Sequence, residues 1–107
     1  MKLFKLPTDF FENEKIKALR CNKDGNIATL IFIMLICSAV KSNANGKVML
    51  TNSIPYDEKM LASIFNFSIK VIADCVELLI KFEFILKQDE FIVVKDINSF
   101  NGYRKKV

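Results

Sequence analysis

The chain has 107 residues, of which 51% are apolar, with 16 lysines and arginines against 12 aspartates and glutamates. This length fits one domain with its own hydrophobic core, which excludes a disordered chain and a scaffold that depends on disulfides. The net charge of +4 lies at the two ends, because residues 1–23 and 97–107 each carry +3 and residues 24–96 carry −2. We therefore expect any contact with a polyanion to involve the ends of the chain.

The residue types that catalysis or cofactor binding would need are scarce. The chain has no histidine, its three cysteines are far apart, and its three glycines are isolated from one another. These features exclude a zinc site, a Cys–His nucleophile and a glycine-rich phosphate loop. The neighbouring carboxylates Asp57–Glu58 and Asp89–Glu90 do not converge on a helix or strand, so they are poor acid–base pairs. We expect no enzyme activity, no cofactor and no metal.

The cysteines and the N-terminal residues indicate the compartment. The number of cysteines is odd, and the first residues contain lysines and no apolar signal region. A reducing, cytosolic setting is expected. We expect Cys37 and Cys75 to be small core residues and Cys21 to be exposed at a helix end.

The first 41 residues predict an arm and two helices. Residues 1–7 form an extended arm, and a first amphipathic helix runs to Arg20 with a capping arrangement that begins at Asp9. A second helix is capped near Asp24 and ends near Lys41. Its uncharged stretch, residues 27–40, is too short to cross a membrane, so no membrane partner is expected.

The second helix is apolar on all sides, which has two interpretations. It is either the central helix of a small core, or it carries an extra apolar stripe that a second subunit covers. We expect a homodimer or a higher assembly. Exchange of the arm would add to that interface through Leu3, Phe4 and Leu6.

Beyond a turn at residues 42–46, the pattern predicts a short strand at 47–50 and a third helix that opens at Pro55. That helix breaks at Asn66–Phe67, and Ser68 caps a fourth helix that ends near Phe82. Residues 84–87 and 91–95 then predict a β-hairpin, and a polar, basic tail follows.

This order of elements predicts a mainly α-helical fold with a small β-sheet, namely a winged helix-turn-helix with an extra N-terminal helix. We assign residues 1–97 to this domain and its arm. Residues 98–107 are assigned to a tail or to the beginning of a linker.

Several short segments carry a family resemblance over most of the chain. They are Leu6-Pro7-x-x-Phe10-Phe11, Ile16-Lys17-x-Leu19-Arg20, the apolar residues 27–40, Asn45-Gly46-Lys47-Val48 and Val76-x-x-Leu79-x-Lys81-Phe82. In their order and spacing they resemble the N-terminal domain of phage replisome organisers, which are relatives of DnaD-type replication initiators. The resemblance implies a self-associating winged-helix module that takes part in DNA binding at a phage origin. It also implies a separate C-terminal region that engages other replication proteins.

One position departs from the family pattern. Where the fourth helix turns into the hairpin, family members often have glycine, and here the junction is Glu83 or Phe84. A left-handed conformation at a non-glycine residue costs about 1 kcal/mol. Either the helix ends differently here or the hairpin leaves at another angle.

The surface of the fourth helix has two interpretations. Lys70, Asp74, Glu77 and Lys81 form one narrow stripe with no net charge, which is typical of a solvated helix face. If the helix meets DNA, its beginning is the expected contact, where Asn66, Ser68 and Lys70 lie beside free backbone N–H groups. For Ser68 the alternative is a helix cap alone.

Two further groups are candidates for phosphate contacts. Lys87 on the hairpin is one, although Asp89 and Glu90 beside it oppose a strongly DNA-binding wing. Arg104, Lys105 and Lys106 form the other, since they are three cations without a nearby acid. The alternative for these three is a solvated chain end or linker.

These observations favour a non-catalytic replication-initiation module that binds double-stranded DNA and self-associates in the cytosol of a bacterial host. A protein-interaction module without direct DNA contact is one alternative. A transcriptional regulator of the same fold, which would bind a palindrome as a two-fold dimer, is the other.

Overall fold

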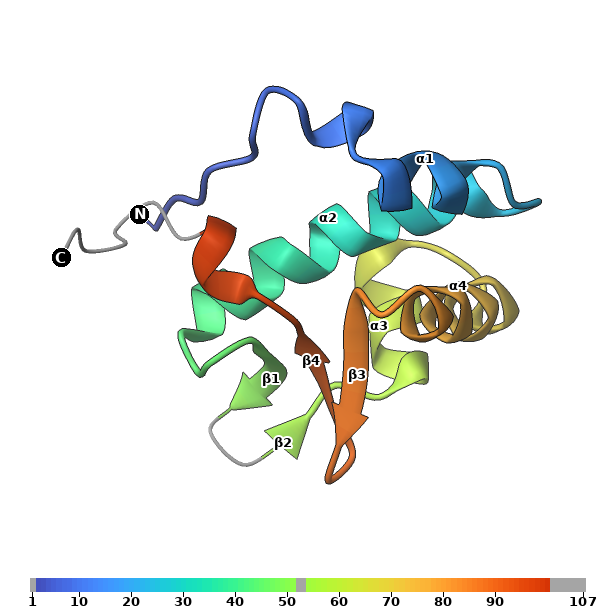
Figure 1. Cartoon of the computed structure of the whole chain (residues 1–107). Coiled ribbons are helices and arrows are strands. Elements are labelled where there is room, and N and C mark those ends of the chain that lie inside the picture. Colours follow the sequence, from blue (N-terminus) through green and yellow to red (C-terminus); the bar gives the residue numbers. More distant parts are fainter. Residues whose placement is uncertain (1, 52–53, 101–107) are drawn as a thin grey trace, which may run out of the picture.

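The computed structural model describes residues 2–51 and 54–100, and these form four α-helices, two 3₁₀ turns and a four-stranded antiparallel sheet (Figure 1). The elements in chain order are η1 (Phe10–Glu12), α1 (Glu14–Arg20), α2 (Gly25–Ser42), β1 (Lys47–Thr51), β2 (Ile54–Pro55), α3 (Glu58–Phe65), α4 (Ile69–Lys81), β3 (Ile85–Gln88), β4 (Phe91–Val94) and η2 (Ile97–Phe100). The fold is mainly α-helical with a small sheet, as predicted.

Helix α1 begins later than the sequence pattern suggested. The side-chain oxygen of Asn13 accepts hydrogen bonds from the backbone N–H groups of Lys15, at 2.8 Å, and Ile16, at 3.2 Å. Asn13 has extended backbone angles and separates α1 from the 3₁₀ turn η1. The prediction of a continuous helix capped at Asp9 is therefore wrong, because a better N-cap lies four residues further on.

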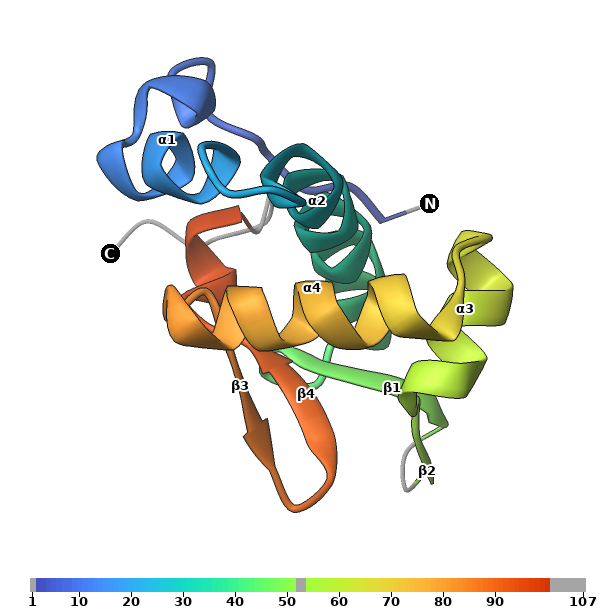
Figure 2. The ribbon, with the colours of Figure 1, turned by 90° about the vertical axis from the view of Figure 1, so that its right-hand side faces the viewer.

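Helix α2 is the centre of the core. Its residues Ala28, Ile31, Leu35 and Ile36 are fully buried. Helix α1, helix α4 and strand β1 all pack against it, and Figure 2 shows α4 crossing in front of it. Within the described residues, α2 is also the one helix long and apolar enough to span a membrane by length and composition, a test that the core helix of a soluble protein also passes. Its burial identifies it as a core helix.

The opposite side of α2 is not covered within this chain. Ile27, Leu30 and Cys37 are exposed, with 48% of Leu30 accessible to solvent. The prediction that Cys37 is a core residue is wrong, because Cys37 follows Leu30 by two helical turns and so lies on the same outer side. Cys75 is buried and Cys21 is exposed, as predicted.

The turn after α2 depends on a glycine. Asn43 ends the helix in the left-handed region, and Gly46 has a φ of +90°. The N–H of Val94 donates to the carbonyl of Gly46 at 2.8 Å, so β4 passes close to this backbone. A Cβ atom on Gly46 would lie 2.5 Å from the Val94 carbonyl oxygen, which no side chain tolerates.

Pro55 does not open the third helix, which corrects the prediction. It lies in β2, opposite Met49 of β1, and the strand order β2-β1-β4-β3 places it on an edge of the sheet. An edge strand accepts proline because it needs fewer backbone donors. Helix α3 begins at Glu58 because the side chain of Asp57 accepts a hydrogen bond from the N–H of Met60 at 2.8 Å.

Helices α3 and α4 are joined by a short turn, as predicted. Asn66 ends α3 with a φ of 64°, and the N–H of Phe67 donates to the Ala62 carbonyl at 3.0 Å. The hydroxyl oxygen of Ser68 then caps α4 by accepting from the N–H of Val71 at 3.1 Å. The two helices have the order and spacing of a helix-turn-helix.

Helix α4 ends in a Schellman motif although it lacks glycine. The N–H of Glu83 donates to the Ile80 carbonyl at 2.9 Å, and the N–H of Phe84 donates to the Leu79 carbonyl at 3.0 Å. Glu83 has a φ of 64°. The helix therefore ends in the conformation that glycine usually provides. Glu83 adopts the left-handed backbone there at a cost of about 1 kcal/mol.

The hairpin is confirmed, with a tighter turn than the pattern suggested. Gln88 pairs with Phe91, which leaves Asp89 and Glu90 as the two turn residues. Both have positive φ, at 52° and 71°, which is typical of a type I′ turn. Its two acidic side chains are exposed at the tip.

Candidate nucleic-acid interface

The turn before α4 brings three of the predicted site residues together. Asn66, Ser68 and Lys70 are all exposed at the beginning of the helix. The Ser68 hydroxyl oxygen is already used by the cap on Val71, although its hydrogen is free to donate. The hydroxyl hydrogen of Ser68 can therefore donate to a phosphate while its oxygen caps α4. The role of a cap alone is equally compatible with this geometry.

Lys70 is paired within the helix. Its Nζ lies 2.9 Å from Oδ2 of Asp74, and this hydrogen bond and the charge of Asp74 raise the pKa of Lys70. Lys70 therefore stays protonated, but a carboxylate accompanies its charge. Because Glu77 and Lys81 continue the same exposed face, α4 presents a stripe with no net charge.

Two exposed isoleucines beside this turn were not recognised in the sequence as surface residues. Ile64 at the end of α3 is 55% exposed, and Ile69 at the beginning of α4 is 51% exposed. Both fall within apolar patterns that read as core. Ile69 lies three residues before the buried Ile72 and so on the same side of α4, which means that periodicity alone gave no signal for its exposure. The turn between α3 and α4 is therefore flanked by two exposed apolar side chains.

Lys87 is also paired. Its Nζ lies 3.4 Å from Oε2 of Glu58, which joins β3 to α3. Asp57 and Glu90 line the same surface depression as this pair. The hairpin side of the molecule is therefore acidic around the one lysine that was predicted to contact DNA there.

Most cations of the first half of the chain have no carboxylate partner. In residues 2–51, seven of them have no carboxylate within 4.0 Å: Lys2, Lys5, Lys15, Arg20, Lys23, Lys41 and Lys47. Arg20 is held in place by Asn26, whose side-chain oxygen accepts from its Nε at 2.8 Å, and by the Phe11 ring at 5.3 Å. Residues 2–23, which include the arm, η1 and α1, carry six cations and three carboxylates, a net charge of +3.

The arm is attached to its own domain. Phe4 and Leu6 pack partly buried against the core, whereas Leu3 is 60% exposed. The Nζ of Lys2 donates to the Lys41 carbonyl at 3.2 Å, so the arm reaches the end of α2. Arg104, Lys105 and Lys106 lie outside the described residues.

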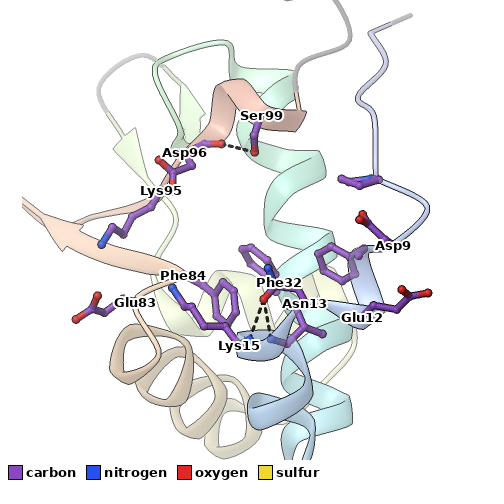
Figure 3. A pocket seen from close by; sticks show the side chains of 13 residues that line it. Asp9, Glu12, Asn13, Lys15, Phe32, Glu83, Phe84, Lys95, Asp96 and Ser99 are labelled. Atoms are coloured by element: carbon purple, nitrogen blue, oxygen red, sulfur yellow. Dashed lines mark hydrogen bonds between the residues drawn. The ribbon is translucent and has the colours of Figure 1, made fainter.

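A cleft opens between η1, α1, α2 and the two ends of the hairpin (Figure 3). Its volume is about 470 Å³. The rings of Phe10, Phe32 and Phe84 follow one another beneath it, with centroids 6.3 Å and 4.9 Å apart. Lys15 lies over the Phe84 ring at 4.6 Å. Charged side chains form the rim, and Lys15 is the one cation of α1 among them.

The described part of the chain contains no group of three or more cysteine, aspartate or glutamate side chains that could hold a metal ion.

Helices α3 and α4, the short turn between them and the hairpin that follows have the order of a helix-turn-helix with a hairpin. Residues 3–106 match the family described as the N-terminal phage replisome organiser. The chain belongs to this family, and its role lies in phage DNA replication. Searches of the curated proteins and of the solved structures found no match.

Proposed function

We propose that this domain is a non-catalytic, winged helix-turn-helix module that binds double-stranded DNA at a phage origin and self-associates there, in the cytosol of the bacterial host. The observation that carries the proposal is the contrast between two groups of cations. Lys70 and Lys87 have carboxylate partners at 2.9 Å and 3.4 Å, whereas among the cations of the arm and of α1 only Lys17 has one, Glu14 at 4.0 Å. Phosphates are attracted most strongly by cations whose charge is not already compensated.

In this mechanism the arm and α1 supply most of the attraction to phosphates. The beginning of α4, with Asn66 and Ser68, docks against the backbone and contributes a few polar contacts. Arg104, Lys105 and Lys106 add three further cations. Individual contacts are weak, and assembly of several copies multiplies them.

The exposed side of α2 supports self-association. Ile27, Leu30 and Cys37 lie on one side of the helix, and Met34 between them is half-buried. A second copy that presents the same side would cover this stripe in a two-fold arrangement. Interaction with other replication proteins is assigned to a separate C-terminal region.

The test is fluorescence anisotropy with a labelled origin duplex, a random duplex and a single strand, at 50 and 200 mM salt. With about four phosphate contacts, we expect the affinity for duplex to fall about 100-fold between these salt concentrations. Lys23→Gln should reduce the slope of log affinity against log salt by about 1. The matched control is Lys59→Gln, which removes an exposed cation that adjoins Asp57 and Glu58 and should leave the slope unchanged.

The neutral stripe on α4 favours a second candidate, a protein-interaction module whose DNA contact lies elsewhere in the full protein. The same experiment separates the two, because this alternative predicts no binding to any of the three nucleic acids at 50 mM salt. Tight binding that is confined to a palindromic duplex would instead indicate a transcriptional regulator.

A further inference from the structure

We propose that the cleft over Phe10, Phe32 and Phe84 binds a segment of a partner protein that presents an aromatic or aliphatic side chain next to lysine or arginine. This is a protein-binding site, separate from the proposed DNA contact at the beginning of α4. Its ligand is identified by two properties of the cleft, the aromatic floor and the charge of the rim.

The floor suits one apolar side chain and its neighbours. Phe32 lies between the other two rings and is almost fully buried, as is Phe10, while Phe84 is half-buried. A volume of about 470 Å³ is within the range of pockets that hold small ligands, and it accommodates a few side chains of a peptide. The accessible apolar surface of the cleft belongs to the half-buried Phe84 and the exposed Pro7, and an apolar side chain of the ligand would pack against these two.

The rim favours cations. Four carboxylates and two lysines surround the opening, which gives a net charge of −2: Asp9, Glu12, Glu83, Asp96, Lys15 and Lys95. Among the described residues, none of these four carboxylates takes part in an ion pair. Figure 3 shows Asp9 and Glu12 on one side of the rings and Glu83 on the other. A ligand with cations on both sides of its apolar group matches this distribution.

Lys15 shows that the site accepts a cation. Its ammonium group lies 4.6 Å from the centroid of the Phe84 ring, which is the geometry of a cation–π contact. An arginine or lysine of the ligand can pair with the carboxylates of the rim. The net negative charge opposes a phosphate backbone, so the cleft suits a basic peptide and not DNA.

The rim is preorganised, which lowers the cost of binding. The hydrogen bonds of the Schellman motif hold the backbone of Glu83. The carbonyl of Asp96 accepts from the N–H of Ser99 at 3.0 Å and from its hydroxyl at 2.9 Å. Asn13 is fixed by its role as the cap of α1. The backbone that carries the rim residues is therefore fixed before a ligand binds.

The probe is the peptide acetyl-Gly-Lys-Phe-Arg-Gly-amide, titrated into the ¹⁵N-labelled chain and followed by NMR. We expect saturable shifts of the amide signals of Asn13, Phe84 and Ser99, with a Kd on the order of 100 μM. A peptide with alanine in place of phenylalanine should bind at least fivefold more weakly. The peptide acetyl-Gly-Glu-Phe-Asp-Gly-amide should produce no saturable shift, and equal binding of this acidic peptide would overturn the proposal.

Two pairs of substitutions test the rim, and a thermal melt confirms that each variant is folded. Glu83→Gln with Asp96→Asn removes two rim charges and should weaken the basic peptide at least tenfold. The matched control, Asp89→Asn with Glu90→Gln, removes two charges from the hairpin turn and should leave the Kd unchanged. If both double variants lose the same affinity for the basic peptide, the peptide is attracted by the net charge of the protein and not by the rim. That result would overturn the proposal.

The last experiment asks whether residues 101–107 of the chain itself, rather than a partner protein, bind in the cleft. Residues 101–107 also contain an aromatic residue and three cations. A chain that ends at Phe100 should bind the probe with an unchanged Kd. Binding that becomes more than fivefold tighter would show that the chain's own end competes for the cleft, and this would overturn the assignment to a partner protein.

Discussion

The Nζ of Lys87 lies 3.4 Å from Oε2 of Glu58, across 29 residues of sequence, and this ion pair joins the hairpin to helix α3. Both side chains are partly exposed, so the pair adds little stability, less than about 1 kcal/mol. Its larger effect is on the proposed DNA contact, because a lysine with a carboxylate partner offers less net charge to a phosphate.

The first prediction concerns this pair. Glu58→Gln should free Lys87 and raise the affinity for duplex DNA at 50 mM salt by about twofold to tenfold, with a slope against log salt that is steeper by about 1. Anisotropy titrations measure both quantities. Glu83→Gln removes an exposed carboxylate that has no cation partner and lies outside the arm and α1, so it serves as the control. An equal rise in both variants would show that only the net charge matters.

The second prediction separates the two roles of Ser68. Ser68→Ala should lower the free energy of unfolding by about 1 kcal/mol, because the N–H of Val71 loses its cap. Ser68→Asp should keep the cap and yet weaken DNA binding, since it places a carboxylate where a phosphate would approach. Urea denaturation and anisotropy give the two measurements. If Ser68→Asp binds DNA as well as the native chain does, Ser68 is a cap and nothing more.

The third prediction concerns the left-handed residue at the end of α4. Glu83→Gly should raise the free energy of unfolding by up to about 1 kcal/mol, because glycine adopts a positive φ without the Cβ strain. Glu77→Gly, in the exposed middle of the same helix, should lower it by about 1 kcal/mol. Urea denaturation of both variants tests the pair. A loss of stability in Glu83→Gly would contradict the Schellman geometry.

The fourth prediction concerns the uncovered side of α2. Leu30→Glu should convert the assembled protein to a single chain without loss of secondary structure, because it places a charge in the proposed interface. The control is Leu50→Glu on β1, since Leu50 is 49% exposed and Leu30 is 48% exposed. Light scattering gives the masses. A native mass equal to one chain across the micromolar range would disprove self-association.

The fifth prediction uses the buried thiol. Burial raises the pKa of Cys75 from 9.0 to about 11, with smaller contributions from Asp24 and Asp74. Between these values the folded state holds a proton that the unfolded state releases, so this thiol makes stability fall as pH rises from about 9 towards 11. Cys75→Ala should remove that part of the pH dependence, which denaturation curves at pH 8 and 10 measure.

Thiol labelling provides an independent check on Cys75. At pH 8, Cys21 and Cys37 should react in the folded protein, and Cys75 only after unfolding, because it is fully buried and has little thiolate. Burial also raises the pKa of Cys37, which slows its reaction. Three thiols that react at one rate would contradict this burial.

The sequence by itself determined the local elements. The break at Asn66–Phe67, the cap at Ser68 and the hairpin followed from residue types whose effect acts within a few positions. The three candidate residues at the start of α4 are also close in sequence, so their proximity needed no tertiary information. The predictions of helix starts that the structure corrected, at Asp9 and Pro55, concerned competition between residues two to four positions apart that could each begin a helix.

Only the tertiary structure decided which residues far apart in sequence meet. Cys37 is exposed because α1, α4 and β1 cover the other side of α2. Lys87 is paired because the sheet places it beside Glu58, and the cleft exists because η1, α2 and both ends of the hairpin converge. Periodicity specifies which side of an element is apolar. Which elements cover that side, and which charges become neighbours, depends on how all the elements pack together.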